Sequence, residues 1–360
     1  MTSCILSTLV SFCTNAIFGD LTHPFSFNQY CSAYNRKLLL GILPVSIFCS
    51  GHTFFVQNLP KKLGLEPYVA HATFQYSGTP GKRNRFREKD LWHDPDSYFQ
   101  SDNGFISAQY KVSDRLLDAV KKGERKFDMN STMPHFNLVN DQILVIRTLF
   151  ALGTTLNRSI VMPKLFCGMD RWWAPHDGNI PGAPLDLPYQ CPLDHVINLE
   201  QLQDDNTKPE QHGPAVEWKE YSFLEKERAS YLQEKKLTVI TCNEKSDMCD
   251  GGDKEAHLIE GKVVKLKAKR TDVQIRTALA SIMHKFDLIV FENPLKLWKG
   301  FEKQEDMSKF VSRYTKIADL WCCIQGHPGH IWYDLFWDTI PHTDKFGRYI
   351  DKEWQPQLGP

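Results

Sequence analysis

The clearest periodic pattern in the chain lies between residues 139 and 163. Its apolar side chains recur at helical spacing, at Ile143, Ile146, Leu149, Phe150 and Leu156. The next run, Ser-Ile-Val-Met-Pro at 159–163, is short and apolar and stops at a proline, which is typical of a buried strand. The pattern therefore predicts a helix that leads directly into a strand.

Three later apolar runs, at 237–241, 263–266 and 288–291, predict further short strands. The apolar stripe within 272–285 predicts a helix between two of them. Alternation of this kind favours an α/β fold with a mostly parallel sheet. The loop at 166–192 is rich in Trp, Pro and Gly, and long loops at strand ends often bind ligands in such folds. A loop held together by its own aromatic rings is the alternative.

The first part of the chain shows weaker patterns. Residues 28–40 predict a helix that ends near Gly41, and residues 54–63 predict a second one that ends at Gly64. Pro67 then begins a short strand that leads to His71. Further on, Ser113 is a candidate N-cap for a helix to Lys122, and the polar run 121–130 predicts a surface linker.

Candidate chemistry is concentrated at 68–88, where a β-prone run is followed by His71, a Ser-Gly-Thr-Pro-Gly turn and a basic run. A histidine at a strand end is a suitable ligand for a transition-metal dication such as Mn²⁺. Gly78 and Gly81 let backbone N–H groups approach phosphate oxygens. Lys82 and Arg85 supply charge for them. The pattern predicts a site for a metal-bound diphosphate; the alternative is a solvated basic helix beside a buried histidine.

Composition narrows the class of ligand. The 360-residue chain is long enough for about two domains, and its 43 basic and 43 acidic side chains give a net charge of zero. A local basic cluster in a neutral chain favours a small anionic ligand over nucleic acid. Aromatic residues make up 12% of the chain and include nine Trp; such rings can stack on sugars, although most aromatic side chains belong to cores.

Cysteine spacing indicates disulfides rather than a zinc site. Cys242 and Cys249 bracket a polar loop, and Cys167 and Cys191 flank the Pro- and Gly-rich loop. With sequons at Asn130 and Asn157, these pairs favour a lumenal compartment. No transmembrane span is predicted, because polar residues interrupt every apolar run of the first nineteen residues. The pair His327 and His330 flanks a Pro-Gly turn, which disfavours a metal site there.

Several of these stretches carry a family resemblance. They are Ile47 to Gln57, His71 to Glu88, Leu91 to Pro95, Asn157 to Pro163 and Asp170 to Gly178. Together they resemble the plant and algal arabinosyltransferases of glycosyltransferase family 77, nearest to the type that extends arabinosides on the hydroxyproline of extensins. The resemblance runs from about residue 28 to the tail.

The resemblance implies a Golgi enzyme with the GT-A nucleotide-diphospho-sugar transferase fold. It implies transfer of arabinofuranose from a UDP-sugar donor onto an arabinosylated, hydroxyproline-rich glycoprotein, with a divalent metal, Mn²⁺ by the family's chemistry. In GT-A enzymes a late histidine binds the metal and a Gly and Lys after it hold the diphosphate. His71 matches the first, and Gly78, Gly81 and Lys82 match the second. No side chain is assigned as catalytic, since a retaining mechanism can use the leaving phosphate as the base.

The resemblance also implies an organisation in three parts. Residues 1–89 match the C-terminal end of the GT-A domain, residues 90–135 are expected to be a linker, and residues 136–360 form a second, Rossmann-like α/β region. The Asp-x-Asp half of such enzymes is not found before the run 49–52, so an N-terminally truncated chain is expected. Two alternatives remain: a non-catalytic remnant that binds an acceptor glycopeptide or partner, and a separate sugar-nucleotide enzyme centred on the later region.

Overall fold

A six-stranded, fully parallel sheet forms the centre of the computed structural model, in the order β11-β10-β13-β5-β6-β9. The structure describes residues 30–33, 38–41, 43–122, 129–171, 185–203, 208–245, 249–250, 254–317, 320–322 and 331–339. The strands are β5 (Phe105–Gln109), β6 (Ser159–Val161), β9 (Trp218–Lys219), β10 (Lys236–Cys242), β11 (Val263–Lys267) and β13 (Leu288–Glu292). The predicted α/β fold with a parallel sheet is confirmed.

The sheet forms because its central strands β5 and β13 bury apolar side chains on both faces. Phe105 and Leu288 are buried on one face and Ile106 and Ile289 on the other, as expected of strands that are covered on both sides. In β10 the buried positions alternate along the strand. In register, Leu237 pairs with Ile289, and Ile289 pairs with Ile106. The chain builds β5, β6 and β9 outward on one side, then crosses to β10 on the other side. This arrangement is doubly wound.

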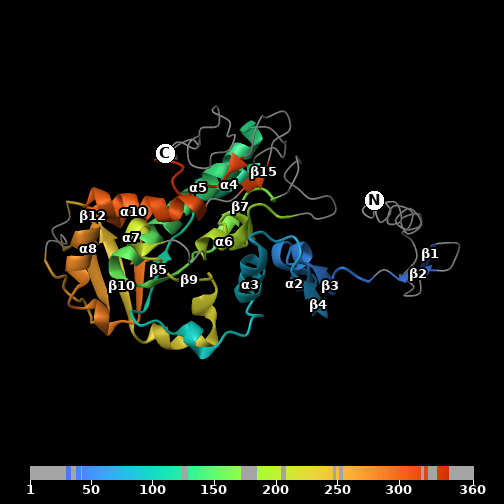
Figure 1. Cartoon of the computed structure of the whole chain (residues 1–360), viewed down its shortest axis with the longest axis horizontal. Helices are drawn as coiled ribbons and strands as arrows, with labels where there is room; N and C mark the ends of the chain where they lie inside the picture. Colours follow the sequence, from blue (N-terminus) through green and yellow to red (C-terminus); the bar gives the residue numbers. More distant parts are fainter. Residues whose placement is uncertain are drawn as a thin grey trace.

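The 28-residue helix α5 (Met129–Leu156) organises the core. It contacts β5, β6 and β7 as well as α8 and α9, and the apolar positions predicted to face inward, from Ile143 to Leu156, are buried. Figure 1 shows α8 and α10 beside the sheet and α5 running past it toward α4. The predicted order of helix and strand over 139–163 is confirmed, since α5 leads into β6.

Shorter elements complete the part of the chain around the sheet. The helices are α4 (Asp114–Lys122), α6 (Leu199–Leu202), α7 (Pro209–His212), α8 (Asp272–Leu279), α9 (Pro294–Leu297) and α10 (Gln304–Tyr314). Three small two-stranded sheets pair β7 (Leu165–Cys167) with β8 (Tyr189–Cys191), β12 (Arg270–Thr271) with β14 (Trp298–Gly300), and β15 (Leu320–Cys322) with β16 (Ile331–Trp332).

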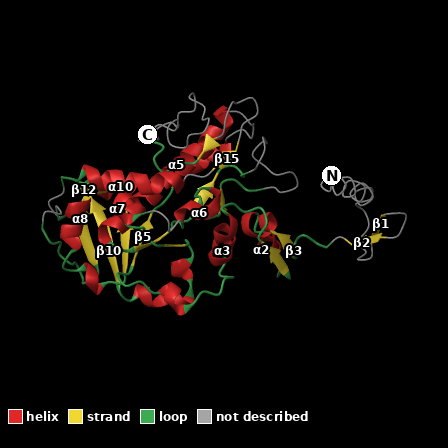
Figure 2. Cartoon of the chain, in the orientation of Figure 1, coloured by secondary structure: helices red, strands yellow, loops and turns green. Residues whose placement is uncertain are grey.

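The segment 48–88 lies to one side of the sheet (Figure 2). Its parallel strands β3 (Phe48–Ser50) and β4 (Val69–His71) are joined through a π-helical turn at His52–Val56 and α2 (Leu59–Leu63). The helix α3 (Gly78–Glu88) follows and packs on α6. The predicted end of the helical stretch at Gly64 and the predicted strand into His71 are both confirmed.

One predicted helix is wrong. Residues 28–40 were expected to be helical, yet Tyr30–Ala33 and Leu38–Gly41 form the antiparallel strands β1 and β2. The run Leu-Leu-Leu-Gly is compatible with either structure, because short apolar runs carry no decisive period. The predicted helix over 272–285 is shorter than expected, since α8 ends at Leu279.

Two further expectations concern connections. The range 90–135, expected to be a linker, contains α4 and the central strand β5, while its residues 123–128 lie outside the described part. Both expected disulfides are present, Cys167–Cys191 and Cys242–Cys249. Among the described residues, no helix has the length and apolar character needed to cross a membrane.

Candidate functional site

His71 ends the short strand β4, opposite Ser50 of β3, and its side chain is exposed. Its backbone carbonyl accepts a hydrogen bond from the N–H of Thr73 at 2.6 Å, which turns the chain toward α3. Within the described ranges, no three His, Cys, Asp or Glu side chains come close enough together to hold a metal ion. His71 is therefore accessible to a cation but does not by itself make a cation site.

The start of α3 is built on two glycines that have little room for a side chain. A Cβ atom on Gly81 would lie 1.8 Å from the carbonyl oxygen of Tyr76, and one on Gly78 would lie 2.1 Å from Oε1 of Glu200. Gly78 also has a φ of +51°, which favours glycine. The exposed carboxylate of Glu200 thus lies at the positive end of the helix dipole. A phosphate bound at this end would have to move Glu200 aside.

Lys82 and Arg85 have opposite surroundings although both belong to α3. Lys82 is exposed. Arg85 is 0% exposed, and its Nε donates to Oδ1 of Asp194 at 2.9 Å. The two Nη atoms of Arg85 are buried and make no hydrogen bond with any described residue. Lys82 can meet a ligand from solvent, whereas Arg85 fixes α3 to the turn at Leu193–His195.

Asp194 is the centre of a buried charge network beneath α3. Its Oδ2 accepts the backbone N–H of Tyr76 at 2.8 Å. The guanidinium of Arg171 lies 3.5 Å from the centre of the Tyr76 ring and donates from Nη1 to the carbonyl oxygen of Asp194 at 2.9 Å. Burial and the nearby Arg85 and Arg171 charges lower the pKa of His195 well below its usual value. The imidazole of His195 is therefore neutral.

A second buried pair links the 49–52 run to Asp170. Nε2 of His52 lies 2.7 Å from Oδ2 of Asp170, and Nε2 of Gln57 lies 2.8 Å from Nδ1 of His52. Because the amide nitrogen of Gln57 donates, Nδ1 accepts and Nε2 carries the proton that is donated to Asp170. Both side chains are buried. Stretches that carry the family resemblance, more than a hundred residues apart, therefore meet in direct contact.

Glu88, the last residue of α3, lines a pocket of about 220 Å³ together with Phe55, Tyr189 and Tyr221. Its Oε1 accepts hydrogen bonds from Nδ2 of Asn84 at 2.9 Å and from the backbone N–H of Leu193 at 3.0 Å. Burial raises the pKa of Glu88 to about 8. A carboxyl group that is protonated near neutral pH and faces a pocket is suited to donate or accept a proton.

Sequence reasoning found the start of α3 but missed Asp170, Asp194 and Glu88 as partners in one cluster. Asp170 and Glu88 do lie within the stretches that carry the family resemblance, and this was the feature of the sequence that could have identified them. Arg87, by contrast, is held in a fork by Asp94, with Nη2 donating at 2.5 Å. Residues 172–184, in the middle of the loop predicted to bind a ligand, and both His327 and His330 lie outside the described residues.

A comparison with known proteins finds one similar plant enzyme. The chain is 37% identical over 328 residues to Arabinosyltransferase XEG113 of Arabidopsis thaliana. The matched region is 91% of this chain and 49% of the relative. The chain spans about half the length of the curated relative that it matches. No family model and no solved structure matches the chain.

Proposed function

We propose that the chain carries part of a glycosyltransferase that moves arabinofuranose from a UDP-sugar onto hydroxyproline-linked arabinosides of extensin-type glycoproteins. The observation that supports this proposal is the 37% identity to a plant arabinosyltransferase over 91% of the chain. Identity at that level over such a length favours the same reaction class. Since the matched region is about half of the relative, the activity of the whole enzyme is part of the proposal.

The donor diphosphate binds at the start of α3 in this proposal, at the end of a GT-A domain. Gly78 keeps the first turn of α3 free of a side chain, and the exposed ammonium of Lys82 neutralises phosphate charge. Gly81, whose N–H donates to the carbonyl oxygen of Ser77, lets the turn before the helix pack closely. Arg85 contributes from below: its ion pair with Asp194 holds the helix in place. Its buried Nη groups add positive potential beneath the helix without touching the ligand.

Mn²⁺ is the proposed cofactor, with His71 as the ligand supplied by the described residues. The cation would neutralise charge on the diphosphate leaving group. Because the described residues complete no ligand set around His71, this chain's own contribution is one accessible imidazole. The proposed compartment is the Golgi lumen, where the glycoprotein acceptor would be met.

Replacing Lys82 tests the donor site. Lys82→Ala is expected to weaken Mn²⁺-dependent UDP binding at least about tenfold, because a charge-assisted hydrogen bond contributes on the order of 1.5–3 kcal/mol. Binding is measured by titration calorimetry on the purified chain. Transfer of radiolabelled arabinofuranose from UDP-arabinofuranose to an arabinosylated hydroxyproline peptide is measured in parallel.

Lys61→Ala is the matched control, because Lys61 is an exposed lysine on the neighbouring helix α2. It is expected to bind UDP like the parent chain. The donor-site proposal is wrong if Lys82→Ala binds UDP as tightly as the parent, or if the parent chain binds none with Mn²⁺ present. Absence of transfer to the peptide by a chain that does bind UDP would contradict the proposed reaction alone.

A further inference from the structure

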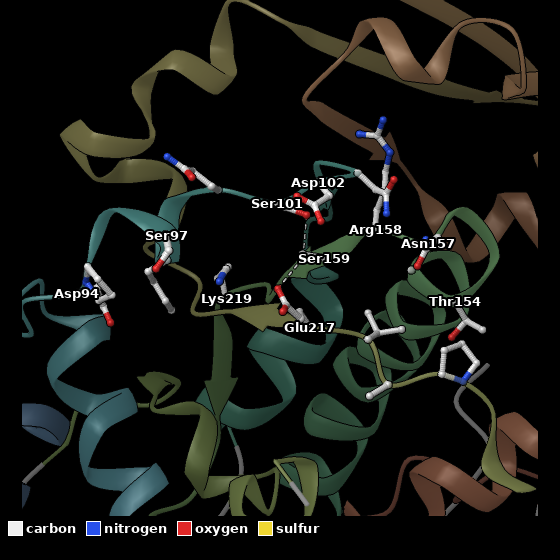
Figure 3. A pocket seen from close by; sticks show the side chains of 18 of the residues that line it. Asp94, Ser97, Ser101, Asp102, Thr154, Asn157, Arg158, Ser159, Glu217 and Lys219 are labelled. Atoms are coloured by element: carbon white, nitrogen blue, oxygen red, sulfur yellow. Dashed lines mark hydrogen bonds between the residues drawn. The ribbon is translucent and has the colours of Figure 1, made fainter. Parts of the chain in front are cut away.

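A second, larger pocket of about 570 Å³ opens at the amino-terminal edge of the sheet. Three segments form most of it: the loop 94–103 that leads into β5, the turn 153–159 between α5 and β6, and the stretch 214–219 that leads into β9. Figure 3 shows the labelled side chains from these segments around one space. Its volume is in the range of small-molecule sites.

The pocket is joined to the proposed donor site through α3. Arg87, near the end of that helix, lines the pocket, whereas Gly78 and Lys82 lie at its start. At 1.5 Å rise per residue, the two ends of this helix are roughly 14 Å apart. The pocket is therefore a different site from the one proposed to hold the diphosphate.

Neutral polar groups that both donate and accept hydrogen bonds make up much of the lining. They are the hydroxyls of Ser97, Ser101 and Ser159 and the amides of Gln100, Asn103 and Asn157. A ligand hydroxyl also donates and accepts, so it can pair with any of these groups. A lining of this kind is complementary to a ligand with many hydroxyls.

Charged side chains in the lining balance one another. Three carboxylates, from Asp94, Asp102 and Glu217, face three cations. Asp94 is already bound in the fork from Arg87, and Arg158 donates from Nη2 to the carbonyl oxygen of Met283. A phosphate here would meet the carboxylates of Glu217 and Asp102 as well as the cations. The balance disfavours an anionic ligand and favours a neutral one.

Among the cations of the lining, only Lys219 makes no hydrogen bond or ion pair with a carboxylate or carbonyl group of the described residues. It is 6% exposed, and its Nζ lies 3.9 Å from the centre of the Tyr98 ring. Nζ makes no hydrogen bond with any described residue, and Figure 3 shows the side chain directed into the pocket. An ammonium in such a place has up to three N–H groups to donate to a ligand.

The residues beneath Lys219 hold it in a fixed position. The Tyr98 hydroxyl donates to Oε2 of Glu220 at 2.5 Å, and the same Glu220 pairs with Lys226 at 2.7 Å. Glu220 is fully buried. Tyr98 is therefore an anchored platform for the Lys219 ammonium, and a group held in advance loses little entropy when a ligand binds.

We propose that this pocket binds a neutral carbohydrate segment, with Lys219 donating to sugar oxygens and Glu217 accepting from sugar hydroxyls. Oε2 of Glu217 also accepts from Ser159 Oγ at 3.2 Å, which orients it. The carbohydrate class follows from the lining. The choice of an arabinoside as its sugar rests on the proposed function. In that case the pocket holds part of the acceptor chain away from the donor.

Binding of an arabinotriose, without UDP or metal, tests this proposal. Titration calorimetry and saturation-transfer NMR on the full chain are expected to show binding, and Lys219→Met is expected to weaken it at least about tenfold, which corresponds to about 1.4 kcal/mol. Lys164→Met is the matched control, because Lys164 also lies over a tyrosine ring, that of Tyr221, but outside the pocket. It is expected to bind the probe like the parent.

A second variant keeps the test valid if the Lys219 substitution unfolds the chain. Ser97 is exposed at the rim, so Ser97→Trp fills the pocket with little effect on the fold, and this variant is expected to abolish binding. The proposal is overturned if the parent does not bind arabinotriose, or if both variants bind it unchanged. It is also overturned if inorganic phosphate or a zwitterionic peptide occupies the pocket in preference to the sugar. Because no donor is present, these outcomes are independent of the transfer assay.

Discussion

Glu88 shows what burial does to a single polar group in this protein. The residue is 7% exposed and its carboxyl group accepts two hydrogen bonds, yet burial still raises its pKa to about 8. The hydrogen bonds and the nearby Arg85 lower the pKa, so the loss of hydration is the stronger effect. The folded protein therefore holds a proton that the unfolded chain releases at much lower pH.

Glu88 is predicted to make the protein less stable as pH rises. In the unfolded chain it ionises near its usual pKa of 4.5, whereas in the folded protein it stays protonated until about pH 8. Between these values the folded state binds one more proton, so the free energy of unfolding falls by up to about 1.4 kcal/mol per pH unit. Glu88→Gln is expected to flatten this slope in urea unfolding followed from pH 5 to 8.

Glu210→Gln is the control for this measurement, because Glu210 is an exposed carboxylate in the first turn of α7. Its substitution is expected to leave the pH slope unchanged. An equal slope in the parent and in Glu88→Gln would contradict an elevated pKa at Glu88. Below pH 4.5 the two proteins are expected to show parallel pH dependence, since Glu88 is protonated in both states there.

At the scale of elements, periodic segments were predictable and ambiguous ones were not. The apolar stripe from Ile143 to Leu156 recurs at helical spacing, so the sequence alone was sufficient to predict the helix α5 and its buried face. The apolar run at 38–40 has no such period, and strand pairing with Tyr30–Ala33 determines its structure. The basic run of α3 has a similar difficulty: burial of Arg85 depends on Asp194, 109 residues away. No local pattern contains that information.

The start of α3 is predicted to be intolerant of any side chain at Gly81. The added Cβ of Gly81→Ala would meet the backbone oxygen of Tyr76 at 1.8 Å, so the turn before the helix must move. We expect a loss of about 1–3 kcal/mol, as for other overpacked sites. UDP affinity is expected to fall as well, because Lys82 moves with the turn. Urea unfolding and calorimetry measure the two effects.

Gly64→Ala is the comparison, since Gly64 ends α2 with a φ of +65° and a Cβ there would have no atom within 4 Å. The only expected cost of this substitution is that of holding an alanine in the left-handed backbone conformation, about 1–2 kcal/mol in the free energy of unfolding. UDP binding is expected to stay at the parent level in Gly64→Ala. A Gly81→Ala chain that keeps both parent stability and parent UDP affinity would show that the turn accommodates the Cβ.

At the scale of the whole molecule, buried polar contacts join the segment 48–88 to the α/β body. His52 pairs with Asp170, Arg85 pairs with Asp194, and Glu88 accepts the backbone N–H of Leu193. Such contacts stabilise little in total, since burying a charge costs free energy, but they fix one arrangement of the two parts. The proposed donor helix is thereby held in one position relative to the body.

Removing one partner of the Arg85–Asp194 pair is predicted to be costly. Asp194→Ala leaves the Arg85 guanidinium buried without a counter-charge and removes the acceptor for the Tyr76 N–H. We expect a loss of about 3–5 kcal/mol in the free energy of urea unfolding. Adding Arg85→Met is expected to restore part of this loss, because the uncompensated charge is then gone.

The matched control is Asp186→Ala, whose exposed pair with Lys62 also joins the two parts. An exposed pair contributes about 0–1 kcal/mol, so equal losses in Asp186→Ala and Asp194→Ala would contradict a buried ionic attachment of the donor helix.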